Sequence, residues 1–406
     1  MLESPNFDFQ KIRFQDILQA YQKCRINKRS TLSSIQFEEN LEKNIIQLTS
    51  DLTSHQYQIK PYSCFAIQDP KLREIWAADF GDRIIHHFLI EYLEKKLEKK
   101  FIFHSYACRK NKGALLAVKY LKKHLPFKQY FLKIDVQSFF TSINKNILFS
   151  LIKKNISHPE ILWLCEKIIF SDPRYNCLIK GDQKLLQSIP LNKSLFHTPA
   201  NQGLPIGNLT SQFWANLYLN HLDQFIKHKL KCPYYFRYMD DMVFLDDSPT
   251  QLLKWEAQVS NFLLNELKLK LHPRKQILQK TKYGVNFLGY IVKPQYILVR
   301  KRIILNLKRK LLILNKKIIS QKQNVDLDFI LKMQASINSY YGHFRAANSY
   351  HLRRTIYQKY FKNIKKYLKP FNQNYTHFIL KHPPSGRCFK KEFLRDETPL
   401  ETDTQK

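Results

Sequence analysis

Apolar residues recur along the chain with two different periods, one typical of helices and one of strands. Steps of three and four, the period of an amphipathic helix, separate the apolar residues Ile304, Leu307, Leu311, Leu314 and Ile318. A similar spacing between residues 85 and 97 predicts a second helix. Further helices are expected over 210–230 and 252–268.

Shorter stretches rich in aromatic and β-branched residues predict strands. Residues 130–140, YFLKIDVQSFF, predict one buried strand, and residues 285–292, VNFLGYIV, predict another. Residues 234–245, YYFRYMDDMVFL, predict two short strands joined at an Asp-Asp turn. Residues 151–200 are expected to form a helical insertion. Because strands and helices intermingle without strict alternation, an α+β fold is favoured over a doubly wound sheet.

The composition adds a strong positive charge to this picture. The 406 residues include 67 Lys and Arg against 33 Asp and Glu, which gives a formal net charge of +34. A polyanion must neutralise such self-repulsion, so nucleic acid or an anionic membrane is the indicated partner. No apolar run approaches the roughly 20 residues that span a bilayer, which disfavours a membrane. The start of the chain lacks a signal-peptide layout, and the seven cysteines are scattered without a Cys-x-x-Cys pair, which predicts reduced thiols in a cytoplasm.

The positive charge is concentrated in one stretch of the chain. No acidic residue occurs between Glu266 and Asp326, whereas lysines and arginines occur throughout. Lys301, Lys308 and Lys316 fall off the apolar stripe of the helix predicted there. A solvated helix face is the ordinary interpretation of a charge run. Without balancing acids, and on a chain this basic, a surface for the phosphates of a duplex is favoured.

Three aspartates stand in apolar surroundings. Asp135 follows an apolar run within 130–140, and Asp240 and Asp241 lie at the predicted hairpin turn. Each of them alone is most often a turn or cap residue. Buried carboxylates are costly without compensation, and two Mg²⁺ ions would compensate all three. One ion would activate the 3′ hydroxyl of a primer, and the other would hold a triphosphate and neutralise the leaving pyrophosphate.

The surroundings of these aspartates resemble the palm of reverse transcriptases. Residues 238–241, YMDD, are similar to the YxDD box of that family, and residues 133–140, KIDVQSFF, are similar to its first catalytic motif. Phe140 has the position of the steric gate, whose ring would clash with a 2′ hydroxyl and select deoxynucleotides. The resemblance implies two Mg²⁺ ions, with Mn²⁺ as a substitute, held by Asp135, the backbone carbonyl of Val136, Asp240 and Asp241.

Further motifs follow in the order expected for that family, over about residues 70–350. Residues 73–87 resemble the fingers segment that guides the template strand. Residues 105–113 resemble the fingers loop whose arginine contacts the incoming nucleotide. Residues 202–216 resemble the motif under the nascent base pair. Together these motifs imply a right-hand polymerase with fingers, palm and a helical thumb.

Individual residues take their implied roles from these positions. Lys275 matches the lysine that protonates pyrophosphate, which makes it a candidate catalytic residue. The implied nucleotide contacts are Arg109, Phe140, Ile206 and Gly207. The implied primer grip comprises Phe287, Leu288, Gly289 and Tyr290. The implied template and duplex contacts are Arg73, Arg83, Lys301 and Lys308.

The resemblance also implies a division into domains. Fingers and palm would occupy residues 1–292, with the palm core at about 130–150 and 200–292. A basic helical thumb would follow at 293–372. A C-terminal tail, partly disordered, would occupy 373–406.

The fourth motif narrows the kind of reverse transcriptase. Residues 204–212, LPIGNLTSQ, with residues 192–196, NKSLF, resemble the enzymes of diversity-generating retroelements. Most bacterial members carry Gln-Gly and Ser-Pro where this chain has Ile-Gly at 206–207 and Ser-Gln at 211–212. The resemblance implies frequent errors at template adenines and cDNA that replaces a variable region of a target gene. An apolar Ile206 would remove a polar check on the nascent pair; the alternative is that Ile206 only packs there.

The implied partners are an RNA template, a DNA or RNA primer, the RNA/DNA hybrid, dNTPs and a small basic accessory protein oligomer. The implied setting is the bacterial cytoplasm, with a bacterial or phage gene. Two alternatives stay open. The first is another bacterial reverse transcriptase, such as one used in phage defence. The second is a catalytically inactive RNA-binding protein derived from a polymerase.

Overall fold

The computed structural model describes residues 12–26, 31–68, 71–321 and 325–381. These residues form two compact units. The first unit comprises the residues up to 288 together with 292–295, and the second comprises 289–291 and the residues from 296 onward. In the described part of the chain, no helix has both the length and the apolar character that a membrane span requires.

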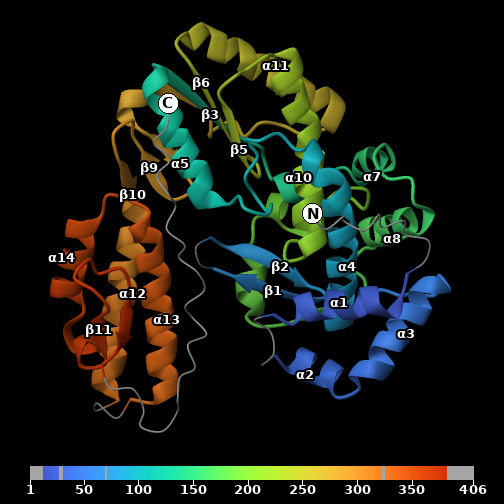
Figure 1. The fold of residues 1–406 in the computed structure, drawn as a ribbon, viewed down its shortest axis with the longest axis horizontal. Coiled ribbons are helices and arrows are strands. Elements are labelled where there is room, and N and C mark those ends of the chain that lie inside the picture. The colour runs from blue at the N-terminus through green and yellow to red at the C-terminus, as the bar shows by residue number, and fades with distance from the viewer. Residues whose placement is uncertain (1–11, 27–30, 69–70, 322–324, 382–406) are drawn as a thin grey trace, which may run out of the picture. The chain divides into compact units, whose positions relative to one another are not determined.

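A four-stranded antiparallel sheet of the first unit has the strand order β5-β6-β3-β7 (Figure 1). Its strands are β3 (Tyr130–Asp135), β5 (Tyr235–Tyr238), β6 (Asp241–Asp246) and β7 (Ile277–Lys280). The helix α11 (Pro249–Leu267) contacts both β3 and β6. The strand predicted over 130–140 is shorter than expected. Ser138 adopts a left-handed conformation (φ 47°), and the helical turn α6 (Phe139–Ser142) follows it.

Two helices lie deep in the core of this unit because they are apolar on most sides. They are α4 (Phe80–Leu97) and α10 (Leu209–Gln224), which contact each other. A π-helical turn, η5 (Phe225–Lys229), continues α10. These helices, together with α11, confirm the helices predicted from the spacing of apolar residues.

A second sheet of the first unit has the order β2-β1-β4. Its strands are β1 (Ser63–Ile67), β2 (Arg73–Ala77) and β4 (Leu178–Ile179). β1 pairs antiparallel with β2 and parallel with β4, so the segment 151–200 adds a short strand here as well as helices. The segment was expected to be a helical insertion, and the short strand β4 within it was not predicted.

Shorter helices complete the first unit. The α-helices are α1 (Phe14–Cys24), α2 (Leu32–Glu38), α3 (Leu41–Thr53), α5 (Ala114–His124), α7 (Lys145–Lys153), α8 (Pro159–Phe170) and α9 (Gln183–Gln187). The 3₁₀ turns are η1 (Glu98–Lys100), η2 (Leu125–Phe127), η3 (Leu191–Lys193), η4 (Leu195–His197) and η6 (Thr281–Tyr283). α1 packs on α4 and α3, which ties the N-terminal helices to the core.

The chain leaves the first unit through a small sheet of order β10-β9-β8. The strands are β8 (Val285–Phe287), β9 (Tyr290–Val292) and β10 (Ile297–Val299). The sequence predicted one strand over 285–292, which is wrong because a turn divides it. Leu288 and Gly289 form this turn with φ values of 50° and 90°. A non-glycine residue in the left-handed region is uncommon, and apolar periodicity gives no sign of it.

The second unit is mainly helical. It contains α12 (Lys301–Ser320), α13 (Leu327–Arg345), α14 (Tyr350–Tyr360), η7 (Lys362–Lys366) and the strand pair β11 (Leu368–Pro370) and β12 (Phe378–Leu380). Leu307, Leu311 and Ile318 are fully buried, which confirms the predicted apolar stripe of α12.

The predicted tail begins later than residue 373. Phe378 is fully buried in the core of the second unit, and β12 pairs with β11, so residues up to 380 belong to that unit. Residues 382–406, the remainder of the predicted tail, lie outside the described residues. Across the described chain, helices mix with mainly antiparallel sheets without regular alternation, which confirms the α+β class.

Candidate active site

The antiparallel register of the central sheet brings three aspartates together. Tyr238 on β5 pairs with Asp241 on β6, so Met239 and Asp240 form the two-residue turn between them. Met239 has a left-handed conformation with φ 51°. On the other side of β6, Asp241 pairs with Asp135, the last residue of β3. The turn thus carries one carboxylate beside two that lie opposite each other.

The carboxylates of this cluster are not fully compensated. Burial and, next, the negative charge of Asp135 raise the pKa of Asp240 to about 7, and a hydrogen bond to Asp135 adds to the shift. One carboxylate oxygen of Asp135, Oδ1, is buried without a hydrogen-bond partner. A buried oxygen of this kind is costly unless a cation or donor meets it. The site therefore has the electrostatics of a cation-binding site.

Two lysines contact the outer carboxylates. Lys275 donates from Nζ to Oδ2 of Asp135. Lys133 on β3 lies with its Nζ 3.1 Å from Oδ1 of Asp241 and also donates to the carbonyl of Asn286 at 2.9 Å. Lys275 is held near Asp135 by the backbone, because His272 N–H donates to the Asp135 carbonyl at 2.8 Å. Each outer carboxylate therefore has one lysine as a partial counter-charge.

The donor set fits Mg²⁺, which prefers carboxylate oxygens. Asp135, Asp240 and Asp241 would hold such ions, and the unpartnered Oδ1 of Asp135 is an oxygen available for one. Among the described residues, no group of three or more His, Cys, Asp or Glu side chains is arranged to hold a metal ion without some movement. Val136 forms a β-bridge with Leu271, and the role of its carbonyl as a ligand stays a prediction.

A backbone hydrogen bond joins the predicted steric gate to the motif under the nascent pair. Phe140 lies on α6, and its carbonyl accepts a hydrogen bond from Leu204 N–H at 2.8 Å. The Ile206 carbonyl accepts from Trp76 N–H at 2.8 Å. Gly207 has φ 128°, and a Cβ there would lie 2.8 Å from the carbonyl oxygen of Trp76. Only glycine fits this close approach to β2.

Arg109 has a different environment from the one predicted. Its side chain is largely buried, and its guanidinium donates to Glu98 at 2.8 Å and to the carbonyls of Ile102 and Ser105. A guanidinium used in this way holds the loop 105–113 in place. The contact of Arg109 with a nucleotide stays a prediction, and the resemblance of the loop gave no sign of these internal contacts.

The predicted template contacts lie on the second sheet and the helix after it. Arg73 is the exposed first residue of β2. Arg83 on α4 donates from Nε to the carbonyl of Ala78 at 2.8 Å. In the second unit, Lys301 begins α12 and is exposed, while Lys308 Nζ lies 4.8 Å from the centre of the Tyr360 ring. The roles of these four residues stay predictions.

The predicted primer grip has residues in both units, Phe287 and Leu288 in the first and Gly289 and Tyr290 in the second. Phe287 is fully buried in the first unit, where Lys133 Nζ lies 6.0 Å from the centre of its ring. Leu288 and Gly289 form the turn described above. In the second unit, Tyr290 stacks on His343 with ring centres 4.1 Å apart and donates from its hydroxyl to the His343 carbonyl.

A buried ion pair behind the hairpin was not predicted from the sequence. Arg237 on β5 and Asp223 on α10 are both 0% exposed, with Nη2 and Oδ2 2.5 Å apart. Tyr235 donates its hydroxyl to Asp223 at 2.8 Å, and Arg237 also donates to Oδ1 of Asn216 at 3.0 Å. An arginine inside the apolar run YYFRY is the signal that could have indicated a buried partner.

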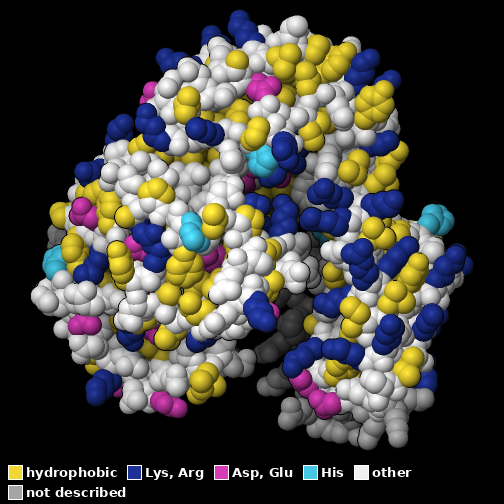
Figure 2. Space-filling view, turned by 180° about the vertical axis from the view of Figure 1, so that it is seen from behind, with side chains coloured by type: hydrophobic (Ala, Val, Ile, Leu, Met, Phe, Trp, Pro, Cys, Tyr) yellow, Lys and Arg dark blue, Asp and Glu magenta, His cyan; other side chains and the backbone are white. Residues whose placement is uncertain are grey.

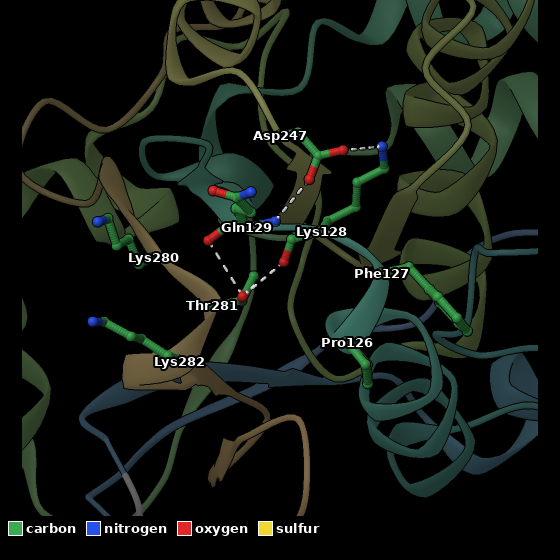
Figure 3. A pocket seen from close by; sticks show the side chains of 8 residues that line it. All are labelled: Pro126, Phe127, Lys128, Gln129, Asp247, Lys280, Thr281 and Lys282. Atoms are coloured by element: carbon green, nitrogen blue, oxygen red, sulfur yellow. Dashed lines mark hydrogen bonds and ion pairs between the residues drawn. The ribbon is translucent and has the colours of Figure 1, made fainter.

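A pocket of about 490 Å³ lies at the opposite end of β3 from Asp135 (Figure 3). In it, Lys128 donates to Asp247 at 2.7 Å, and Thr281 donates from its hydroxyl to the Lys128 carbonyl. Lys280 and Lys282 are exposed at its edge. Because β3 separates this pocket from the aspartates, it is not part of the candidate active site.

Comparison with known proteins matches the region that contains the site. The family model "Reverse transcriptase (RNA-dependent DNA polymerase)" matches residues 68–292, more than half of the chain. The group II intron-encoded protein LtrA of Lactococcus lactis subsp. cremoris is 22% identical over 342 residues, which cover 68% of this chain and 54% of that protein. The putative COX1/OXI3 intron 2 protein of Saccharomyces cerevisiae is 20% identical over 306 residues, which cover 61% of this chain and 34% of that protein.

The chain thus spans about half or less of the length of these relatives. The family match nevertheless includes all three aspartates, the hairpin that carries two of them, and the α+β core that supports them. The chain belongs to the reverse transcriptase family, and its first unit has the α+β fold of that family's polymerase domain.

Proposed function

We propose that this chain is an RNA-directed DNA polymerase that copies an RNA template into DNA by two-metal nucleotidyl transfer. One observation carries the proposal. Asp135 is buried and has an unpartnered carboxylate oxygen, and the partly buried Asp240 beside it has a raised pKa. A protein retains such repulsion where a cation or substrate is to be bound.

The residues of the chain divide the work as follows. Asp135, Asp240 and Asp241 would bind the ions, which when bound activate the primer hydroxyl and neutralise pyrophosphate. Lys275, already hydrogen-bonded to Asp135, supplies a proton to the leaving pyrophosphate. The Phe140 ring excludes a 2′ hydroxyl, which restricts the product to DNA.

The charge of the chain supports a nucleic-acid substrate. Figure 2 shows Lys and Arg side chains over much of one face and few acidic ones. The formal net charge of +34 matches a polyanionic partner. In the second unit, the exposed residues of α12 include Lys301, Arg309 and Lys317, which suit contacts with duplex phosphates.

The finer proposal is error-prone cDNA synthesis in a diversity-generating retroelement, with a small basic accessory protein oligomer as partner and the bacterial cytoplasm as the setting. The motif residues 204–212 and 192–196 support it by resemblance. Ile206 supports it physically, because an apolar side chain there offers no hydrogen bond to the nascent pair. Discrimination by shape alone is limited to roughly 1–3 kcal/mol per group.

Primer extension on a defined RNA template, with sequencing of the products and Asp240→Asn as the control, tests both the polymerase activity and the retroelement assignment. Extension by the wild type alone, with errors concentrated at template adenines, is the expected result. Rare, evenly spread errors would leave the polymerase standing and reject the retroelement assignment. Equal RNA binding by both proteins with no extension by either, in Mg²⁺ or Mn²⁺, would favour the inactive RNA-binding alternative.

A further inference from the structure

The segment 192–196, Asn-Lys-Ser-Leu-Phe, has no chemistry of its own in the proposed function, yet it contacts β2 through a buried carboxylate. Glu74 on β2 is 3% exposed. Its carboxylate accepts hydrogen bonds from Ser194 Oγ at 2.5 Å, from Leu195 N–H at 2.8 Å and from the Trp76 indole N–H at 2.6 Å. Three donors compensate this carboxylate, so its role is to hold the segment and not to react.

The same segment also contacts the short helix that carries the steric gate. Asn192 donates from Nδ2 to Ser138 Oγ at 3.1 Å, and its carbonyl accepts from Thr141 Oγ1 at 3.0 Å. Ser138 and Thr141 lie on either side of Phe140 in the sequence. The gate helix is therefore anchored to the segment at both of its ends.

A third set of contacts reaches the chain segment that leads to Ile206. A Cβ on Gly203 would lie 2.6 Å from Leu195 Cδ1, so Leu195 fills the space beside that glycine. The Phe196 ring packs on Trp76 with centres 4.9 Å apart. Trp76 in turn donates its backbone N–H to the Ile206 carbonyl at 2.8 Å. Glu74 and Trp76 thus hold both the segment and the predicted floor of the nascent pair.

We propose that Glu74 and residues 192–196 form a brace that fixes the position of Phe140 relative to Ile206 and so sets how strictly the enzyme selects nucleotides. Glu74 is the positioning residue of this brace. The effect on nucleotide selection rests on the proposed polymerase function. The brace itself rests only on the hydrogen bonds and packing contacts given above. A shift of about 1 Å at either side would alter the fit of a nucleotide without changing the aspartates.

The test compares Glu74→Ala with a matched control, Asp82→Asn. Asp82 is a similarly buried carboxylate of the same unit, and it accepts from the Tyr57 hydroxyl at 2.7 Å and from Lys60 N–H at 3.0 Å, neither of which belongs to the brace. Single-nucleotide kcat and KM are measured for correct and incorrect dNTPs and for the matching ribonucleotide. Glu74→Ala should raise the ratio of incorrect to correct kcat/KM roughly tenfold. Glu74→Gln, which still accepts hydrogen bonds, should restore most of the discrimination, and Asp82→Asn should leave the ratio unchanged.

Amide hydrogen exchange in the absence of substrate gives a readout that does not depend on polymerisation. Faster exchange at residues 138–141 and 203–207 is expected in Glu74→Ala and not in Asp82→Asn. The brace would be overturned if residues 138–141 and 203–207 exchanged equally fast in Glu74→Ala and Asp82→Asn. It would also be overturned if the two variants, at matched loss of thermal stability, discriminated equally between correct and incorrect dNTPs. Failure of the wild type to extend a primer would reject the proposed function, and the exchange result would still decide whether the brace exists.

Discussion

Two carboxylates near the β5–β6 hairpin of the first unit, Asp223 on α10 and Asp240 in the hairpin turn, have opposite environments. Behind the hairpin, Asp223 is fully buried and accepts hydrogen bonds from Arg237 and from the Tyr235 hydroxyl. At its turn, Asp240 lies against Asp135, whose Oδ1 has no hydrogen-bond partner. Both regions involve the same strand pair, because Arg237 lies on β5 and Asp240 lies in the turn between β5 and β6.

The difference separates a group that stabilises the fold from one that is kept for chemistry. A buried charge with a full set of partners contributes to one defined arrangement of α10 against β5. A buried carboxylate held beside another carboxylate costs stability, and a protein tolerates this where a ligand later compensates it. Removing charge should therefore have opposite consequences for folding in the two regions.

The largest effect is expected for Asp240→Asn. Loss of one carboxylate from the ion-binding set should reduce primer extension by about 10³-fold or more, because metal ligation contributes several kcal/mol to the transition state. The unfolding free energy in EDTA should stay equal or rise, since the repulsion with Asp135 is relieved. Extension assays and urea denaturation measure the two quantities. An inactive variant that is also much less stable would remove the contrast between the regions.

Arg237→Leu should act on stability. Removing one partner of a fully buried pair leaves Asp223 uncompensated and should cost roughly 3–5 kcal/mol of unfolding free energy. The double variant Asp223→Leu/Arg237→Leu should recover part of this loss, because no isolated charge is left. Denaturant titration of the three proteins measures the effect, and a loss below about 1 kcal/mol in the single variant would contradict the assignment.

The pH dependence of stability should also differ between the regions. The pKa of Asp240 is raised to about 7 by burial and then by Asp135, above the value near 3.9 of an unfolded aspartate. The folded state thus holds a proton that the unfolded state releases, so stability in EDTA should fall as pH rises from about 4 to about 7. Asp240→Asn should flatten this slope. Asp82, whose pKa burial raises to about 6, should account for part of what remains.

The control for this pH experiment is Asp82→Asn, which should remove only the part of the pH dependence of stability that comes from Asp82. Thermal unfolding at half-unit steps of pH measures it. If the slope were unchanged in Asp240→Asn, Asp240 and Asp135 would not share a proton in the folded protein.

The smallest effect is expected from Mg²⁺ itself. An ion that binds only the folded state should raise the unfolding free energy by about 1.4 kcal/mol at tenfold its Kd. Differential scanning fluorimetry with and without Mg²⁺ detects such a shift. The shift should disappear in Asp240→Asn and persist in Arg237→Lys at temperatures where that variant is folded. A shift of equal size in Asp240→Asn would place the ion elsewhere.

Apolar spacing predicted the long helices well, because recurring buried residues determine them, along one face of the helix or on most of its sides. The stripe of α12 and the deep helices α10 and α4 are examples. The aspartates were also predictable, since adjacent strands bring residues of different motifs together. The hydrogen-bond partners of individual side chains were not predictable from the sequence. Arg109 matches a nucleotide-binding position, yet Glu98 and two carbonyls occupy its donors.

Contacts between segments that are distant in the sequence account for other features that the sequence did not predict. Glu74 meets Ser194 and Leu195 across 120 residues of chain, and nothing near Glu74 in the sequence indicates that pairing. The turn at Leu288 was missed for a local reason. A leucine with positive φ contradicts the usual preference for glycine, so the run VNFLGYIV resembles one strand although it forms two.

The register that places Asp135 opposite Asp241 limits how this chain can change in length. Side chains alternate between the two faces of a strand, so loss of one residue within β3 would exchange the positions of Ile134 and Asp135. An apolar side chain would enter the site and a carboxylate would enter the core in a single step. Insertions and deletions in descendants of this sequence should therefore accumulate in connections such as 171–177, between α8 and β4, and be absent from residues 130–135.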